Sequence, residues 1–341
     1  MIGTSSFSLD DSAWLAHRYD ESADAFQFVR LDREARRTAT FLSDEYLPDD
    51  LKPTVIARAE IPDALQKNSP LHYIFHSGFC CSTLLTRALD QSGMSTGLSE
   101  PTVLRDMSGY RQRANNDKKV AAVLEQTLAL LARPFETSEA VVAKPSCTVN
   151  GLADQLLAMH EDSRALFLYA PIRLFLNSIA RKGITGRLWG RELFLTLQKT
   201  GQIDLGFDAE QLFGQTDLQI AGLAWLAQNK IFESLLNEYG SDRVASLDSE
   251  TFLAHRAESL ARIGRVFALD MDDGRAQAIA ESDVFQRHSK FGDDFDASRR
   301  KAEQAAGESA HADEIEKVAI WAEAVAKGLN IPIRPSGNIM D

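Results

Sequence analysis

The stretch that decides the fold runs from Tyr73 to Leu89 and reads YIFHSGFCCSTLLTRAL. It is entered by residues 71–77, a short apolar run with aromatic and β-branched side chains, which is typical of a buried strand. From Leu84 onward the apolar residues recur at the spacing of one helical face. Between the two lies a short turn of small and polar residues. The stretch therefore predicts a strand, a tight turn and a helix in direct succession.

Short apolar runs continue to alternate with helical patterns along the chain. Further strands are expected at residues 139–144, 164–170 and 242–248. This alternation predicts a three-layer α/β fold, in which helices cover both faces of a parallel sheet. Ligands of such sheets bind beyond the carboxyl ends of the strands, which is where the turn at residues 76–83 is expected to lie.

Several helices are also expected from apolar periodicity. They cover residues 117–133, 217–240, 249–267 and 312–328. Ser249 is an acceptable N-cap for the third, because its hydroxyl can accept a hydrogen bond from a main-chain N–H group of the first turn.

The start of the chain differs in pattern from the rest. Residues 1–70 are interpreted as an N-terminal extension packed on the core, and residues 71–341 as the α/β domain. Within the extension, residues 12–19 and 33–47 have helical spacing, and residues 25–31 are consistent with a strand.

Composition limits the classes of partner. The chain has 341 residues and a formal charge of −12, from 49 acidic and 37 basic residues. A net negative charge disfavours nucleic acid, whose phosphate backbone attracts positive charge. No apolar run approaches the roughly 18 residues of a membrane span, and the first residues do not resemble a signal peptide. A cytoplasmic protein that binds neither nucleic acid nor membrane is expected.

The three cysteines are Cys80, Cys81 and Cys147. An odd count with an adjacent pair is a poor disulfide framework, and the spacing does not suggest a metal site. They are expected to be small buried residues in a reducing compartment. A nucleophilic role for Cys80 is an alternative, because the start of a helix lowers the pKa of a thiol.

The turn has the features of an anion cradle. A helix N-terminus presents unpaired N–H groups and about half a positive charge. Gly78 permits tight backbone geometry, and Ser82 and Thr83 add hydroxyl donors. An ordinary strand–helix turn is the alternative reading of the same shape. The Walker signature is missing from the residues after Gly78, which disfavours an ordinary P-loop ATPase or GTPase.

Residues 74–93, IFHSGFCCSTLLTRALDQSG, resemble the phosphosulfate-binding loop of the sulfotransferases, and the match runs through Ser82-Thr83-Leu84-Leu85. Residues 98–101, 164–183 and 242–269 are similar to later segments of that family. The resemblance covers roughly residues 70–270 and suggests a divergent bacterial member. It implies a P-loop-like α/β fold that uses 3′-phosphoadenosine 5′-phosphosulfate (PAPS), with its product PAP (3′-phosphoadenosine 5′-phosphate), a small-molecule acceptor and no metal.

The resemblance also assigns positions. Phe79 stands where the family loop has a lysine or arginine, and Cys80 and Cys81 replace the next two residues. Tyr169 stands at the position of the arginine that binds the 3′-phosphate, and Ser178 lies one residue beyond the position of its serine partner.

Basic residues elsewhere are candidates to supply the missing charge. Residues 171–191 carry five basic residues and no acid, a concentration that suits a phosphorylated ligand, although a solvated helix face would look the same. The expected nucleotide-binding residues are Gly78, Phe79, Cys80, Cys81, Ser82, Thr83, Arg173, Ser178, Arg181, Lys182 and Arg187, with Arg191 completing the basic cluster.

Three further residues are candidates for the chemistry. Lys144 ends an expected strand on the ligand side, Glu100 follows a short second strand, and His76 adjoins the turn. A carboxylate or imidazole here can take a proton from an acceptor hydroxyl. The loops expected at residues 102–116 and 184–216 would line the acceptor, and residues 287–292, with His288 and Lys290, would form a lid.

The sequence thus favours a sulfotransferase-like protein that transfers a sulfuryl group from PAPS or a related nucleotide to a small acceptor. Two alternatives remain open at this point. One is a nucleotide-dependent phosphotransferase or hydrolase on the same fold, which would require Mg²⁺. The other is a nucleotide-binding protein without catalytic activity, which the uncharged Phe79 and Tyr169 favour.

Overall fold

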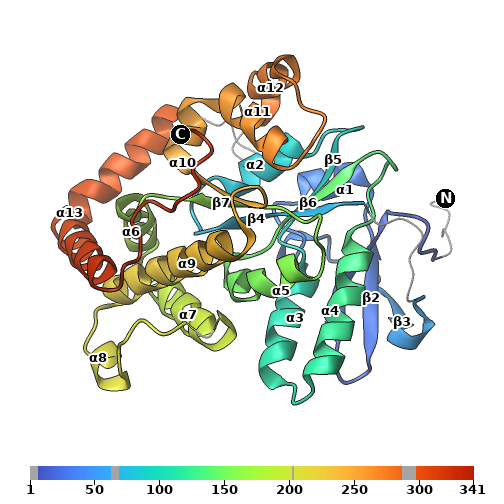
Figure 1. Cartoon of the computed structure of the whole chain (residues 1–341), viewed down its shortest axis with the longest axis horizontal. Coiled ribbons are helices and arrows are strands. Elements are labelled where there is room, and N and C mark those ends of the chain that lie inside the picture. The colour runs from blue at the N-terminus through green and yellow to red at the C-terminus, as the bar shows by residue number, and fades with distance from the viewer. Residues whose placement is uncertain (1–6, 63–68, 202, 286–296) are drawn as a thin grey trace.

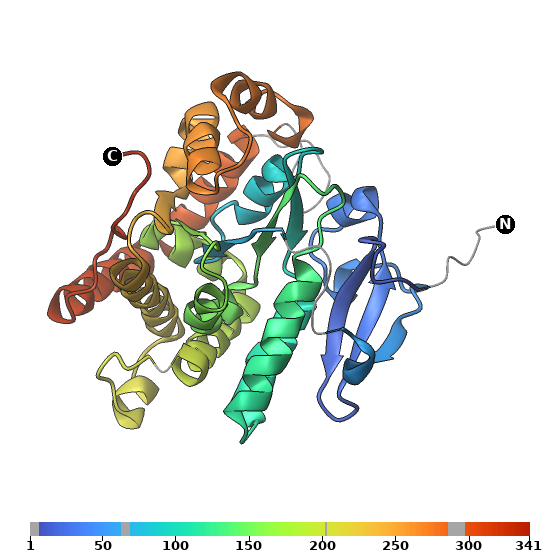
Figure 2. The ribbon, with the colours of Figure 1, turned by 45° about the vertical axis from the view of Figure 1, so that its right-hand side comes forward.

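The structure is a computed structural model that describes residues 7–62, 69–201, 203–285 and 297–341, with the side chains of residues 297–310 left out of the description. It contains a parallel sheet and a smaller antiparallel sheet, with helices around them (Figures 1 and 2).

The central sheet has five strands in the order β5-β6-β4-β7-β8, and every neighbouring pair is parallel. The strands are β4 (Leu71–His76), β5 (Ser95–Ser99), β6 (Ala140–Lys144), β7 (Ala165–Tyr169) and β8 (Val244–Asp248). The middle strand, β4, is buried along its whole length because helices cover both faces of the sheet. The predicted α/β fold with a parallel sheet is therefore confirmed.

The helices lie on both sides of this sheet. In the view of Figure 1, α2, α11 and α12 lie above it, whereas α3, α4, α5 and α7 lie below it. In chain order the helices are α1 (Arg33–Thr38), α2 (Ser82–Leu89), α3 (Thr102–Arg113), α4 (Asp117–Leu131), α5 (Ala153–Ala158), α6 (Ile172–Arg181), α7 (Gly183–Gly201), α8 (Ala209–Phe213), α9 (Asp217–Tyr239), α10 (Ser249–Ala254), α11 (Arg256–Val266), α12 (Asp273–Ala280) and α13 (Ala297–Gly328). Short 3₁₀ helices are η1 (Asp44–Tyr46), η2 (Arg58–Glu60), η3 (Cys147–Leu152) and η4 (Asp283–Phe285).

The N-terminal residues form a second sheet of three antiparallel strands, β1 (Trp14–Asp20), β2 (Ala25–Arg30) and β3 (Thr54–Ala57). This sheet packs on α3, where the Arg18 Nε and the Tyr19 main-chain N–H both donate to the Asp106 carboxylate, at 2.8 and 3.0 Å.

The helix expected at residues 12–19 was wrong, since these residues form most of β1. Residues 14–19 form a strand because of a contact with another strand. Tyr19 packs on Phe26 of β2 with ring centroids 5.0 Å apart, and cross-strand aromatic contacts of this kind override a weak helical pattern.

Two other expectations need correction. The helix expected at 249–267 is divided at His255 into α10 and α11, and its cap is Asp248, whose carboxylate accepts from the N–H groups of Glu250 and Thr251. The segments expected as loops at 102–116 and 184–216 contain α3, α7 and α8. In α3 and α7 the apolar residues recur at helical spacing and are buried, whereas α8 is a short exposed helix that begins with a capping box at Asp208. The lid expected at 287–292, with His288 and Lys290, lies outside the described residues.

None of the helices within the described ranges combines the length and the apolar character needed to cross a membrane. Within the same ranges, no group of three or more His, Cys, Asp or Glu side chains is arranged to hold a metal ion.

Candidate active site

The turn between β4 and α2 is built from left-handed backbone. Gly78, Phe79 and Cys81 have φ angles of 87°, 56° and 63°. Non-glycine residues seldom adopt positive φ, and such strained positions concentrate at functional sites. A Cβ atom at Gly78 would lie 3.2 Å from the Trp189 ring, so the turn also approaches α7 closely. The result is a compact loop that leads directly into the unpaired N–H groups at the start of α2.

The His76 side chain holds this turn through hydrogen bonds. Its Nδ1 accepts from the Gly78 main-chain N–H at 3.1 Å, and its Nε2 donates to the Pro145 carbonyl at 3.0 Å. An N–H group can only donate and a carbonyl can only accept, so the ring is neutral with its proton on Nε2. Both ring nitrogens are therefore engaged in holding the turn.

A buried polar network holds the carbonyl groups of the same strand end. The Asn150 side-chain amide donates to the His76 carbonyl at 3.0 Å and to the Gln228 side-chain oxygen at 2.9 Å, and Gln228 donates to the Ser77 carbonyl at 3.3 Å. Asn150 lies in η3 and Gln228 in α9, which are far apart in sequence. The turn is thus fixed from several elements.

Lys144 and Glu100 meet at the carboxyl ends of β6 and β5. The Lys144 Nζ lies 2.5 Å from the Glu100 Oε1, and the Glu100 main-chain N–H donates to the Lys144 carbonyl at 2.7 Å. Glu100 has a φ of 50°, so its backbone too is left-handed. The Lys144 side chain is only 1% exposed, and a buried ammonium group of this kind requires a partner. The Glu100 Oε1 also lies 4.0 Å from the His76 Nε2.

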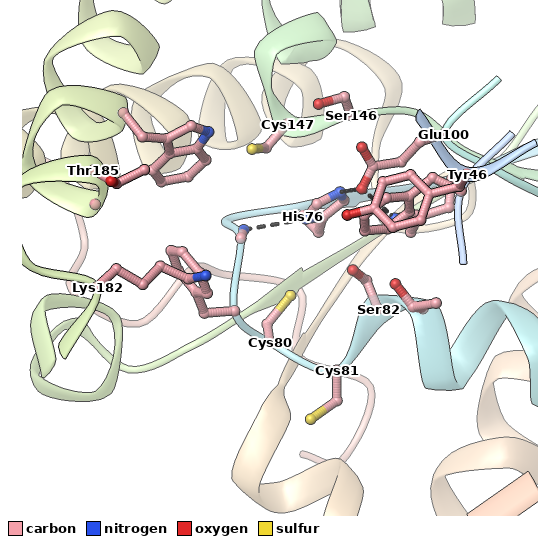
Figure 3. Close-up of a pocket in the computed structure, with 17 residues that line it drawn as sticks. Tyr46, His76, Cys80, Cys81, Ser82, Glu100, Ser146, Cys147, Lys182 and Thr185 are labelled. Atoms are coloured by element: carbon pink, nitrogen blue, oxygen red, sulfur yellow. Dashed lines mark hydrogen bonds and ion pairs between the residues drawn. The ribbon is translucent and has the colours of Figure 1, made fainter. Parts of the chain in front are cut away.

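A pocket of about 350 Å³ joins these features (Figure 3). It falls within the range of ligand pockets, which begins near 300 Å³. The predicted residues that line it are His76, Gly78, Phe79, Cys80, Cys81, Ser82, Thr83, Glu100, Lys144 and Lys182. In Figure 3, Lys182 and Thr185 lie on the opposite side of the turn from Glu100 and Tyr46, so the pocket has two ends.

The basic cluster is dispersed by the fold. The Arg173 guanidinium pairs with Glu316 at 2.8 Å and with Glu323 at 2.5 Å, both on α13, and these contacts raise the pKa of Arg173 above its ordinary value. Arg187 pairs with Glu314 at 2.9 Å, also on α13. A local stretch without acids is thus neutralised by acids more than a hundred residues away in sequence.

The other members of the cluster differ in their surroundings. Arg191 pairs with Asp217, and the Ser178 hydroxyl donates to the Leu174 carbonyl at 2.9 Å within its own helix. Arg181 and Ser178 lie outside the residues that line the pocket. Lys182 lines it, with its Nζ 5.7 Å from the centroid of the Phe79 ring.

Cys80 is fully buried, and this burial raises the pKa of its thiol to about 11. Burial likewise raises the pKa of the Cys147 thiol. A thiol with so high a pKa carries little thiolate at neutral pH, which disfavours the nucleophilic role considered for Cys80. The effect of burial exceeds that of the helix N-terminus.

Several pocket residues were missed by the sequence analysis. They are Phe41, Tyr46, Ser146, Cys147, Thr185, Gly186 and Trp189. Phe41 and Tyr46 come from the N-terminal extension, and no local pattern connects them to a turn more than thirty residues later. Trp189 lies in α7, in a segment interpreted as a loop. A helical interpretation of residues 182–190 would have placed Lys182, Gly186 and Trp189 near one another.

The fold and site together define an α/β protein whose turn at the carboxyl ends of its parallel strands leads into the start of a helix and lines a pocket. No protein-family model and no curated protein matches the sequence. Among solved structures, the chain is similar to the sulfotransferase domain from the curacin biosynthetic pathway, with 13% identity, a TM-score of 0.44, and coverage of 79% of this chain and 100% of that domain. It is also similar to the sulfotransferase domain from the Synechococcus PCC 7002 olefin synthase, with 14% identity, a TM-score of 0.39, and coverage of 67% and 87%.

Proposed function

We propose that the protein binds PAPS, or a related phosphorylated nucleotide, and transfers its sulfuryl group to the hydroxyl of a small acceptor. The observation that carries this proposal is the convergence of three features on one pocket: the turn that opens α2, the Lys144–Glu100 pair and Lys182. The resemblance of the turn to the sulfotransferase loop supports the same reading.

The turn is the proposed phosphate site. Ser82 and Thr83 line the pocket, and their hydroxyls and the first N–H groups of α2 are the proposed donors to the oxygens of an anion. The left-handed backbone at Phe79 and Cys81 is already in place, so little reorganisation accompanies binding.

The two lysines supply positive charge from different directions. Lys144 rises from the end of β6, and Lys182 enters from the end of α6. Sulfuryl transfer, like phosphoryl transfer, depends on positioning and on stabilising negative charge as the leaving group departs. In this proposal, Lys182 stabilises the negative charge that a basic residue at position 79 would otherwise stabilise.

Glu100 is the proposed proton acceptor. In the transfer, the acceptor oxygen forms a bond to sulfur, the bond from sulfur to the phosphate oxygen breaks, and the hydroxyl proton passes to a base. Glu100 is the carboxylate in the pocket, and Lys144 fixes its position. His76 is assigned the role of holding the turn, because both of its nitrogens are already engaged.

The three cysteines are free thiols, which suits a reducing compartment such as the cytoplasm.

A binding protein without turnover is the second candidate, and the absence of a cation on the turn itself at Phe79 favours it. The position of Lys182 beside the Phe79 ring opposes it.

Calorimetric titration with PAP, ATP and GTP, each with and without Mg²⁺, tests the proposal. We expect micromolar binding of PAP that is independent of Mg²⁺ and is weakened by Thr83→Ala. Binding of ATP or GTP that requires Mg²⁺ would instead indicate a phosphotransferase. If none of the three nucleotides binds, the proposed function is wrong.

A further inference from the structure

The N-terminal extension runs along the segment that carries Glu100. The Leu42 main-chain N–H donates to the Ser99 carbonyl at 2.7 Å, and the Thr102 N–H donates to the Leu42 carbonyl at 3.2 Å. The Ser99 hydroxyl donates to the Thr40 carbonyl at 3.0 Å. Residues 40–42 therefore brace both flanks of Glu100, whose left-handed backbone requires such support.

The same segment places an aromatic ring on Lys144. The Lys144 Nζ lies 4.6 Å from the centroid of the Phe41 ring, within the range of a cation–π contact. The amine thus contacts both the Phe41 ring and the Glu100 carboxylate, which is 2.5 Å away. In a buried position, the ring both excludes water and stabilises the charged form of the amine.

Tyr46 adds a second aromatic ring beside Phe41, and it also lines the pocket. Its ring meets the Phe41 ring edge to face, with centroids 4.9 Å apart, and Figure 3 shows Tyr46 at the same end of the pocket as Glu100. Both rings line the pocket, and Tyr46 is 44% exposed whereas Phe41 is half-buried. The N-terminal extension thus contributes two aromatic rings to one end of the pocket: Phe41 beside Lys144, and the more exposed Tyr46.

We propose that residues 40–46 of the N-terminal extension are part of the active site and that Phe41 is a positioning residue, whose ring holds the Lys144 amine against Glu100 and ready for an anion. The contact between the Phe41 ring and Lys144 does not depend on the proposed function, whereas the statement that Lys144 binds an anion rests on it. Residues 40–46 lie outside residues 70–270, the part whose sequence resembles the sulfotransferases.

The first test measures how fast acetic anhydride labels Lys144 in the ligand-free protein, by mass spectrometry of its peptide. Phe41→Leu removes the ring but keeps an apolar side chain, and we expect it to raise the labelling rate by about tenfold, because the amine becomes accessible and less strongly protonated. Phe41→Tyr keeps the ring and should stay within twofold of the wild type.

Phe28→Leu is the matched control. Phe28 is a fully buried ring of β2 in the same extension, so its replacement weakens the packing of the extension without touching the pocket. We expect no change in Lys144 labelling. Equal labelling of Phe41→Leu and wild type, or an equal rise in Phe28→Leu, would overturn the proposal.

The second test measures PAP affinity by calorimetry. Phe41→Leu should weaken binding about threefold to tenfold, and Phe41→Tyr should restore it. If the wild type binds PAP and Phe41→Leu binds it equally well, Phe41 does not position Lys144 for the anion. If the wild type binds no PAP, the proposed function fails, whereas the labelling experiment still decides whether Phe41 holds Lys144.

Discussion

Lys144 is the last residue of β6 and Glu100 directly follows the adjacent parallel strand β5, and the two residues contact each other twice, through their side chains at 2.5 Å and through the main chain at 2.7 Å. Their burial is unequal, since the side chain of Lys144 is 1% exposed and that of Glu100 is 19% exposed. The pair therefore combines a fully buried cation with an anion that reaches the pocket.

This inequality predicts unequal effects on stability. Glu100→Ala leaves the Lys144 ammonium buried without its carboxylate and should lower the free energy of unfolding by about 3 kcal/mol, near the cost of breaking a buried pair. Lys144→Met should cost less, because Glu100 can be solvated. Urea unfolding of both variants and of the double variant measures this. Equal and additive losses would show that the two groups do not depend on each other.

Gly78→Ala should damage the turn. Gly78 has a φ of 87°, and an added Cβ would lie 3.2 Å from the Trp189 ring. We expect a loss of stability of roughly 1–2 kcal/mol and weaker PAP binding. Gly93→Ala is the control, since Gly93 also has a positive φ of 74° but nothing lies within 4 Å of its added Cβ. If both variants bind PAP as the wild type does, the turn is not the phosphate site.

The Asn150 amide should be needed for ligand binding although it lies beneath the turn. Asn150→Asp replaces the group that donates to the His76 carbonyl with an oxygen that repels it, which should cost about 2 kcal/mol of stability and weaken PAP binding. Asn229→Asp is the matched control, because Asn229 is equally buried and donates to the Pro332 carbonyl at 3.1 Å, away from the turn. Similar weakening of PAP binding in both variants would contradict a specific role for Asn150.

His72 should make the protein less stable in mild acid. This residue is buried in β4 against the Phe267 ring, and burial lowers its pKa from 6.5 to about 4. Between these two pH values the unfolded chain binds a proton that the folded chain does not. The free energy of unfolding should therefore fall by roughly 3 kcal/mol as the pH falls through this window.

His72→Asn separates this effect from other titrations. An asparagine oxygen can still accept the hydrogen bond from the Arg164 main-chain N–H, now made by the His72 Nδ1 at 3.2 Å, but it does not titrate. Urea unfolding at several pH values should show a smaller loss of stability between pH 6.5 and pH 4 in the variant. An unchanged pH dependence would mean that other groups cause it.

Local patterns predicted the parallel strands and the turn because each is encoded within a short stretch. The apolar run before His76 and the small residues after it are sufficient to place a strand and a tight turn. The pairing of Arg173 with Glu316 and Glu323 is different, since it depends on where α13 packs. For the same reason the sequence indicated a basic cluster where the structure contains ion pairs.

The contribution of the N-terminal extension was also hidden from sequence reasoning. Phe41 reaches Lys144 only because residues 40–42 run beside residues 99–102, and nothing in either segment specifies that pairing. Conversely, the candidate trio of His76, Glu100 and Lys144 does lie together, because the carboxyl ends of neighbouring parallel strands share one edge of the sheet.

The affinity of PAP for a matched pair of variants tests the central claim most directly. Lys182 lines the pocket beside Phe79, whereas Arg173 of the same basic stretch faces α13. Measured by calorimetry, Lys182→Ala should weaken PAP binding by about tenfold, which is the loss of one charge-assisted contact, and Arg173→Ala should leave it within twofold of the wild type. The opposite order, or no binding of PAP to the wild type, would contradict the assignment of this pocket as the nucleotide site.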